Sequence, residues 1–252
     1  MTYDYAIFLC GNTGAGKSTL ANVLGGQFEA GFAVGEGLTK HASYCHVNID
    51  NDSVLLIDAP GLYEASEANT QRNASEIQKA LGYDVPYKIA FVVADKSGRW
   101  SAEDVSMIDK VVNVVSPPRN EKMEYVLIIN KILPNDWDHY MDNNKSSLIL
   151  SKLHDALRTG VMFNQLLFCP YVRNPVVDSM LKEKLMNVFR MTIQRPIVVT
   201  RDLEVSNNDL KLYEKILLGV FSPVWAPIVG ICAAYSSVKN KIKYDDWEPF
   251  AY

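Results

Sequence analysis

A glycine-rich stretch of eight residues constrains the fold of this chain more than any other part of its sequence. Residues 11–18 read Gly-Asn-Thr-Gly-Ala-Gly-Lys-Ser, directly after the apolar run 5–10 and directly before the helix-forming run 19–24. The stretch fits the pattern G-x-x-x-x-G-K-[ST] between a strand and a helix, which is the context that a phosphate-binding loop requires. We therefore expect a strand, a loop that wraps around phosphate groups, and a helix.

The chemistry of this loop gives its residues their expected roles. Successive backbone N–H groups and the N-terminus of the following helix can bind the oxygens of a phosphate chain. The Lys17 ammonium is expected to reach the β- and γ-phosphates, and the Ser18 hydroxyl is expected to bind Mg²⁺. The residues of this segment predicted to bind a nucleotide are Gly11, Asn12, Thr13, Gly14, Ala15, Gly16, Lys17, Ser18 and Thr19.

The composition allows one sizeable domain and bears on the class of ligand. With 252 residues and 48% hydrophobic content, the chain is long enough for one α/β domain with an extension. The net charge of −4 argues against broad nucleic-acid binding, so we expect a small ligand and no nucleic-acid partner. Four scattered cysteines and the lack of a secretion signal predict a cytoplasmic protein.

Apolar strands alternate with helical segments along the chain. The runs expected to be strands buried on both faces are 5–10, 53–57, 89–94 and 125–129. The alternating run 42–49 is expected to pair with 53–57 as an edge strand. This pattern predicts a three-layer α/β fold of the P-loop NTPase class, with a mainly parallel sheet. We expect a domain over 1–200 and a helical, hydrophobic extension over 201–252.

Three polar positions outside the loop are expected to complete the phosphate site. Asp58 ends an apolar run, where an acid can hold Mg²⁺ through water, and the backbone N–H of Gly61 can bind a γ-phosphate. Thr39 lies in a flexible, glycine-rich stretch, where it can close over the metal and the γ-phosphate. The predicted metal ligands are therefore Ser18, Thr39 and Asp58, and the Asp-x-x-Gly pattern is typical of GTPases.

The base is expected to bind at Asn130 and Lys131, which end another apolar strand. The lysine stem can lie along a purine face, and the asparagine can bond the base edge or brace the loop. A GTPase normally has Asn-Lys-x-Asp, whose carboxylate accepts hydrogen bonds from guanine, but this chain has Leu133 in that place. Asp136 is a candidate substitute. We therefore expect GTP and GDP with Mg²⁺, and keep an ATP-using P-loop protein as the weaker alternative.

Leu62 follows Gly61, where many small GTPases place a glutamine that orients the attacking water. A leucine cannot orient water, so hydrolysis should be slow or completed by a group from elsewhere. Two functions remain open: a GTPase switch stimulated by self-association, and a nucleotide-gated oligomeric scaffold with negligible turnover.

Three segments together resemble one family of GTPases. Residues 98–104 read Gly-Arg-Trp-Ser-Ala-Glu-Asp, residues 39–40 read Thr-Lys, and residues 58–62 read Asp-Ala-Pro-Gly-Leu. Over about residues 5–195 the chain resembles the immunity-associated GTPases (the GIMAP family), which are related to septins and to the chloroplast outer-membrane import GTPases. The resemblance implies a GTP-dependent fold that self-associates through its nucleotide face, often beside a membrane.

Arg99 and Asn174 are two further candidate site residues. Arg99 is the best candidate for a cation that reaches a partner's γ-phosphate; the alternative is an ion pair with Glu103 or Asp104 on its own helix. The family usually has asparagines after the last strand to cover the base, and Asn174 is the candidate in this chain. The predicted catalytic residues are Lys17, Thr39 and Arg99.

The end of the chain contains an uncharged stretch of bilayer length. Residues 216–235 carry no charged side chain, and three lysines follow before residue 244. Pro223 and Pro227 argue against a straight spanning helix, because each removes a backbone hydrogen bond. We expect residues 216–243 to contact a membrane, at the cytoplasmic face, or to be buried in a protein interface.

Overall fold

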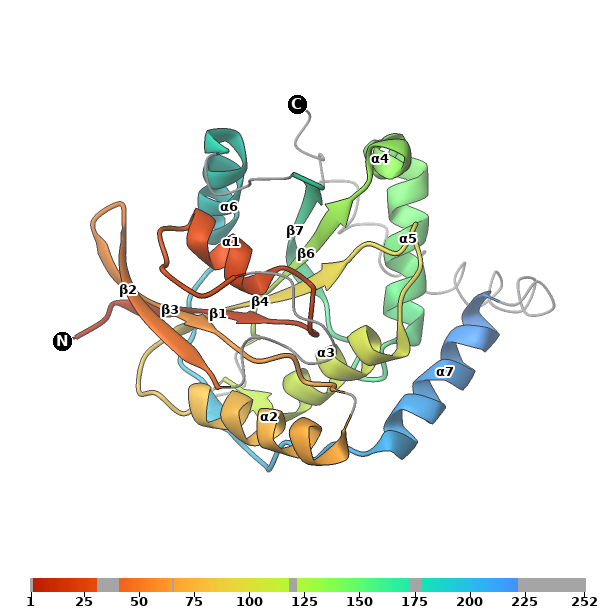
Figure 1. The fold of residues 1–252 in the computed structure, drawn as a ribbon, viewed down its shortest axis with the longest axis horizontal. Coiled ribbons are helices and arrows are strands. Elements are labelled where there is room, and N and C mark those ends of the chain that lie inside the picture. The colour runs from red at the N-terminus through yellow and green to blue at the C-terminus, as the bar shows by residue number, and fades with distance from the viewer. Residues whose placement is uncertain (1, 31–40, 65, 118–121, 173–177, 222–252) are drawn as a thin grey trace.

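The computed structural model describes residues 2–30, 41–64, 66–117, 122–172 and 178–221 (Figure 1). Two predicted site residues, Thr39 and Asn174, lie outside these ranges. Residues 222–243 of the predicted membrane-contacting segment lie outside them as well. None of the helices within the described ranges combines the length and the apolar character that crossing a bilayer requires.

Six strands form one sheet in the order β2-β3-β1-β4-β6-β7. Their bounds are Tyr5–Cys10 (β1), Ser43–Ile49 (β2), Asp52–Asp58 (β3), Tyr87–Ala94 (β4), Tyr125–Ile132 (β6) and Phe163–Pro170 (β7). The edge strand β2 runs antiparallel to β3, and all other neighbours are parallel. The predicted edge hairpin and the mainly parallel sheet are therefore confirmed. The glycine-rich loop follows the last residue of β1, an inner strand, so it lies at the edge of the sheet where the parallel strands end.

Helices cover both faces of this sheet and complete three layers (Figure 1). Their bounds are Lys17–Val23 (α1), Glu67–Ala80 (α2), Ala102–Val114 (α3), Pro134–Met141 (α4), Asn143–Ala156 (α5), Ser179–Met191 (α6) and Asn207–Phe221 (α7). Ile7 packs in one core with residues of α1 and α6, whereas Phe8 packs in the other with residues of α2, α3 and α5. Successive residues of a strand point to opposite faces, so one buried strand supplies both cores.

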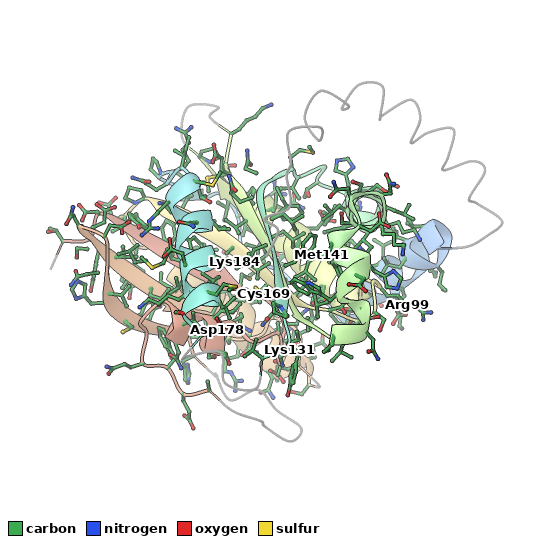
Figure 2. The ribbon with its side chains drawn as sticks, turned by 90° about the horizontal axis from the view of Figure 1, so that it is seen from above. Arg99, Lys131, Met141, Cys169, Asp178 and Lys184 are labelled. Atoms are coloured by element: carbon green, nitrogen blue, oxygen red, sulfur yellow. The ribbon has the colours of Figure 1, made fainter. Side chains whose placement is uncertain are left out.

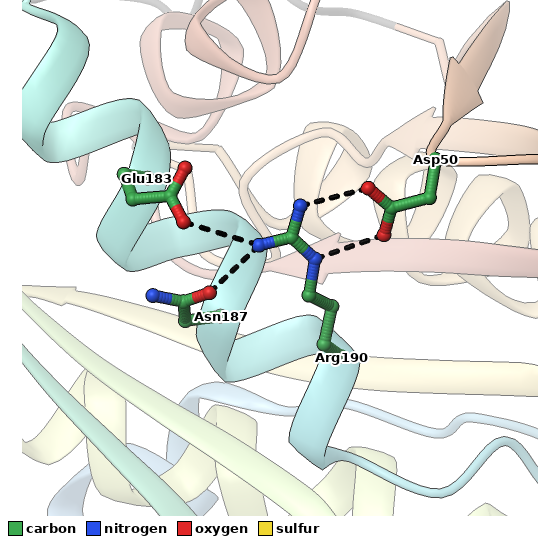
Figure 3. Close-up of polar contacts among 4 residues, drawn as sticks. All are labelled: Asp50, Glu183, Asn187 and Arg190. Atoms are coloured by element: carbon green, nitrogen blue, oxygen red, sulfur yellow. Dashed lines mark hydrogen bonds and ion pairs between the residues drawn. The ribbon is translucent and has the colours of Figure 1, made fainter.

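An arginine fork ties α6 to the turn between β2 and β3 (Figure 3). The Arg190 guanidinium donates to both carboxylate oxygens of Asp50, over 2.8 and 2.7 Å, and also reaches Glu183 and Asn187 on its own helix. Arg190 thereby holds the pKa of Asp50 below its usual value. The contact fixes the hairpin against the helix at the end of the sheet remote from the glycine-rich loop.

Helix α7 packs on α3 and α5 and belongs to the same core. Tyr213 and Leu217 are buried against the residues of that core, and Lys110 of α3 forms an ion pair with Asp209 over 2.8 Å. A two-stranded sheet of Val115–Ser116 (β5) and Val198–Val199 (β8) precedes this contact. The first part of the predicted extension thus contributes to the domain, while the division of the chain at residue 200 stays a prediction.

Candidate nucleotide-binding site

The glycine-rich loop wraps between the end of β1 and the start of α1, braced from β6. Gly16 has φ 95°, in the left-handed region, and a Cβ there would lie 2.4 Å from Asn130 Nδ2, so a glycine is required. The same Nδ2 donates a hydrogen bond to the carbonyl of Ala15 over 2.9 Å. Asn130 therefore braces the loop, which is one of the two roles expected of it.

Lys17 begins α1 and is buried in the loop. Its side chain is 6% exposed, and Nζ donates to the carbonyl of Asn12 over 3.2 Å. Burial lowers the pKa of the Lys17 ammonium, and the nearby Asp58 carboxylate opposes that shift. An ammonium held at the floor of a loop of backbone N–H groups suits an anionic ligand, because the ligand's charge offsets the cost of burial.

Two oxygen-bearing side chains meet beside Lys17. The Ser18 hydroxyl donates to Asp58 Oδ2 over 2.5 Å, and Asp58, at the end of β3, is 1% exposed. Hydroxyl and carboxylate oxygens are ligands that Mg²⁺ prefers, so this pair fits the predicted metal. The third predicted ligand, Thr39, is outside the described residues.

The Asp-x-x-Gly turn lies directly against the glycine-rich loop. A Cβ on Gly61 would lie 2.3 Å from Thr13 Oγ1 and 2.4 Å from Thr13 N, which shows how closely the two backbones approach. The Thr13 hydroxyl donates to Glu64 Oε1 over 2.5 Å, and the Tyr63 N–H donates to Asn12 Oδ1 over 3.3 Å. These contacts of Thr13 and Glu64 were not foreseen from the sequence.

The next residue, Leu62, points away from the loop. Its side chain is fully buried, and Tyr63 follows it into the same core, where its hydroxyl bonds Ser106 over 2.5 Å. The Leu62 side chain therefore cannot reach a phosphate. The first side chain after Gly61 that returns to the loop is that of Glu64.

The described part of the expected base-binding side lies at the end of β6, where Lys131 is located, and at the start of α4 (Figure 2). Lys131 has φ 63°, and its Nζ donates to the carbonyl of Gly14 over 2.7 Å, so its stem lies beside the loop. Leu133 is 51% exposed and precedes the first turn of α4. Asp136, the candidate substitute, accepts a hydrogen bond from Ser97 over 3.1 Å. That bond holds its carboxylate toward the loop that follows β4.

Arg99 is exposed in the loop between β4 and α3 (Figure 2). Within the described part of the chain its guanidinium forms no ion pair with Glu103 or Asp104, contrary to the alternative considered from the sequence. Asp104 instead turns inward, accepting from Asn12 Nδ2 over 2.9 Å and from Ser101 Oγ over 2.6 Å. Arg99 is therefore available to a group outside the domain.

A cavity of about 200 Å³ lies between the glycine-rich loop, Tyr63 and the start of α3. Its lining includes Asn12, Lys96, Glu103 and the buried Asp104. Burial raises the pKa of Asp104, and the hydrogen bonds from Ser101 and Asn12 oppose that shift. The pair Asn12 and Asp104 links the loop to α3, and no sequence signal marked it.

Ionisation of Asp104 is expected to lower the free energy of unfolding as the pH rises. Because its native pKa is raised, the native state binds more protons than the unfolded state between the ordinary aspartate pKa and the raised value. Its contribution to the free energy of unfolding therefore falls as the pH rises through that window. We expect Asp104→Asn to flatten this part of the stability profile, measured by urea denaturation from pH 4 to 7. An unchanged profile would show that Asp104 does not cause this pH dependence of stability.

Comparison with known families identifies the class of protein. The sequence profile of a family described as "50S ribosome-binding GTPase" matches residues 6–131, which is half of the chain and contains the loop, Asp58, Gly61, Asn130 and Lys131. The chain belongs to this GTPase family. The predicted GTPase class is therefore confirmed.

Curated relatives of this GTPase share only part of their length with it. The chain is 26% identical over 138 residues to GTPase Der of Francisella tularensis, and 27% identical over 129 residues to that of Francisella philomiragia. These alignments cover 55% and 51% of this chain, but only 28% and 26% of the relatives. The chain thus spans little more than a quarter of the length of the curated relatives it matches.

Solved structures show the same fold. Toc33 from Arabidopsis thaliana in complex with Mg²⁺ and GMPPNP has a TM-score of 0.52 at 15% identity, covering 76% of this GTPase and 87% of Toc33. Era in complex with MgGDPNP and nucleotides 1506–1542 of 16S ribosomal RNA has a TM-score of 0.50 at 18% identity, covering 75% and 57%. The predicted fold class is confirmed, and so are GTP or GDP and Mg²⁺ as the ligands of such domains.

The expectation that nucleic acid can be excluded as a partner is wrong. Era has this fold and was crystallised with a segment of 16S ribosomal RNA. The exclusion rested on the net charge of −4, which sums over the whole surface and carries no information about a local basic patch.

Proposed function

We propose that this GTPase is a Mg²⁺-dependent switch that hydrolyses GTP slowly and is stimulated by self-association. The observation that carries the proposal is the burial of Leu62 beside a loop where Lys17, Ser18 and Asp58 come together. Lys17 and the loop N–H groups bind the phosphates and stabilise charge, and the Gly61 N–H binds the γ-phosphate. Bound Mg²⁺, held by Ser18 and Asp58, would neutralise charge on the β- and γ-oxygens. The buried Leu62 side chain cannot orient the attacking water.

The same observation favours a second candidate, a nucleotide-gated scaffold with negligible turnover. In that case binding of GTP reorganises the Asp-x-x-Gly turn and exposes or builds a docking surface, without hydrolysis on the time scale of signalling. The two candidates differ only in whether a missing catalytic group is supplied. We favour the first, because Arg99 is exposed in the loop before α3.

Self-association is proposed to supply that group through Arg99. An arginine provided by a second molecule can stabilise charge on a transferring phosphoryl group. Support comes from a structure of the same fold, with a TM-score of 0.52 at 15% identity: dimerization is important for the GTPase activity of the chloroplast translocon components atToc33 and psToc159. A finer relationship to the immunity-associated GTPases is part of this proposal.

Guanine is the proposed base, with the Lys131 stem along its face, Asn130 bracing the loop beside it and Asn174 as a further contact. The exposed Leu133 cannot accept hydrogen bonds from guanine, so discrimination against adenine should be weaker than in a GTPase with an aspartate there. The ATP-using alternative is kept as an outcome of the binding measurement below. Contact of residues 216–243 with the cytoplasmic face of a membrane also remains a proposal.

The test of the proposed function is GTP hydrolysis under single-turnover conditions at increasing protein concentration. We expect the rate per molecule to rise with concentration in the wild-type chain. Arg99→Ala should lower the rate at high concentration by at least about tenfold, because a trans arginine typically contributes far more than that. Arg201→Ala, which removes another exposed arginine, is the matched control. A rate that does not depend on concentration would favour the scaffold, and an intact rise in Arg99→Ala would exclude its trans role.

A further inference from the structure

The Asp-x-x-Gly turn packs directly against the glycine-rich loop, on the side where the proposed function places the γ-phosphate. In the proposed function this phosphate is bound on one side by Lys17 and the loop, and on the other by the Gly61 N–H. In the structure Gly61 instead lies in direct contact with Thr13, since a Cβ added to it would be 2.3 Å from Oγ1 and 2.4 Å from N of that residue. The turn must therefore move away from Thr13 before a triphosphate can bind.

Hydrogen bonds from two directions hold the turn in this position. On the loop side Thr13 Oγ1 donates to Glu64 Oε1 over 2.5 Å. On the α2 side, Asn73 Nδ2 donates to the carbonyl of Gly61 over 2.6 Å, and the Glu64 N–H donates to Thr70 Oγ1 over 3.1 Å. Glu64 thus belongs to a segment anchored on the helix, and only its side chain reaches the loop.

The Glu64 carboxylate lies at the loop residue against which Gly61 is packed, because it accepts a hydrogen bond from the Thr13 hydroxyl. In the proposed function the γ-phosphate binds between this loop and Gly61. A terminal phosphate would have to displace this carboxylate or bind beside it against charge repulsion. A diphosphate, which ends at the β-phosphate, requires neither.

We propose that the contact between Thr13 and Glu64 is a latch that sets the preference of the site for GDP over GTP. The latch rests on the proposed function, because it acts at the γ-phosphate position of that site. It makes Glu64 a specificity-determining residue for the number of phosphates, separate from the residues that recognise the base. Breaking the contact should release the turn and improve triphosphate binding relative to diphosphate binding.

The experiment is a titration of the nucleotide-free full chain with fluorescent GDP and with a fluorescent, non-hydrolysable GTP analogue, both with Mg²⁺. The readout is the ratio of the two dissociation constants. We expect Glu64→Ala and Thr13→Val each to shift that ratio about tenfold toward the triphosphate, as for loss of a hydrogen bond to a charged group. Glu64→Gln, which keeps an acceptor but loses the charge, should fall between. Glu103→Gln, which removes the charge of another acid beside the loop, is the control.

A double-mutant cycle separates a latch from independent damage to the loop. If Thr13 and Glu64 act through one contact, the double variant should shift the ratio no further than either single variant. Shifts that add, or an unchanged ratio in Glu64→Ala, would overturn the proposal. Failure of the proposed nucleotide site gives a different result, because neither nucleotide would then bind the wild-type chain. Loss of hydrolysis in Glu64→Ala with an unchanged ratio would assign Glu64 to water positioning and contradict the latch.

Discussion

Lys17→Ala is expected to lower the affinity for GTP and GDP by at least about a hundredfold. Lys17 is the buried cation at the floor of the loop, and its replacement removes charged hydrogen bonds to two phosphates, each contributing about 1.5–3 kcal/mol. Mg²⁺ held by Ser18 and Asp58 would not replace the hydrogen bonds that the Lys17 ammonium donates. The measurement is titration with fluorescent nucleotides.

The fold should survive this substitution. Burial lowers the pKa of Lys17, so its removal relieves a cost of folding in the nucleotide-free chain. We expect the melting temperature without nucleotide to stay the same or to rise, while stabilisation by added GDP disappears. Lys145→Ala, which removes an exposed lysine of α5, should bind as the wild type does. Wild-type affinity in Lys17→Ala would refute the phosphate site.

The second large effect is expected at Asp109, which joins three parts of the fold. This buried carboxylate of α3 accepts from the backbone N–H groups of Arg158 and Thr159 over 2.8 and 3.0 Å, from Thr159 Oγ1 over 2.5 Å, and from the Tyr213 hydroxyl of α7 over 2.7 Å. Asp109→Ala leaves these donors without their acceptor. We expect a loss of about 3 kcal/mol in the free energy of unfolding, measured in urea.

Two further variants show whether Asp109 acts through α7. Tyr213→Phe removes one of the four donors and should cost about 1 kcal/mol. Asp138→Ala, at an exposed aspartate of α4, should cost less than about 0.5 kcal/mol. If Asp109→Ala were no more destabilising than Asp138→Ala, the carboxylate would not hold α3, the turn after α5 and α7 together.

Most of the sheet could be predicted because its inner strands have continuous apolar sequences. The runs 5–10, 53–57, 89–94 and 125–129 all lie within observed strands, since parallel strands buried on both faces need apolar side chains throughout. Helix α4 was missed. It is a short segment with mostly polar side chains that starts at Pro134, and such a segment cannot be told from a loop by periodicity.

The site could be predicted only where a local motif carries its chemistry. The loop residues, Asp58 and Gly61 stand in patterns whose spacing is fixed by the phosphate chain. By contrast, Thr13 meets Glu64 across 51 residues and Asn12 meets Asp104 across 92, so these contacts depend on tertiary packing. The prediction that nucleic acid is not a partner failed for a related reason. A net charge does not describe how charges are placed on the folded surface.

The central claim, that this chain binds guanine nucleotides with Mg²⁺ at the glycine-rich loop, is tested most directly by calorimetric titration of the nucleotide-free full chain with GDP and with ADP. We expect one GDP bound per chain, affinity lost on removal of Mg²⁺ or in Lys17→Ala, and ADP binding at least about tenfold weaker. Equal or tighter binding of ADP, or no binding of either nucleotide, would contradict it.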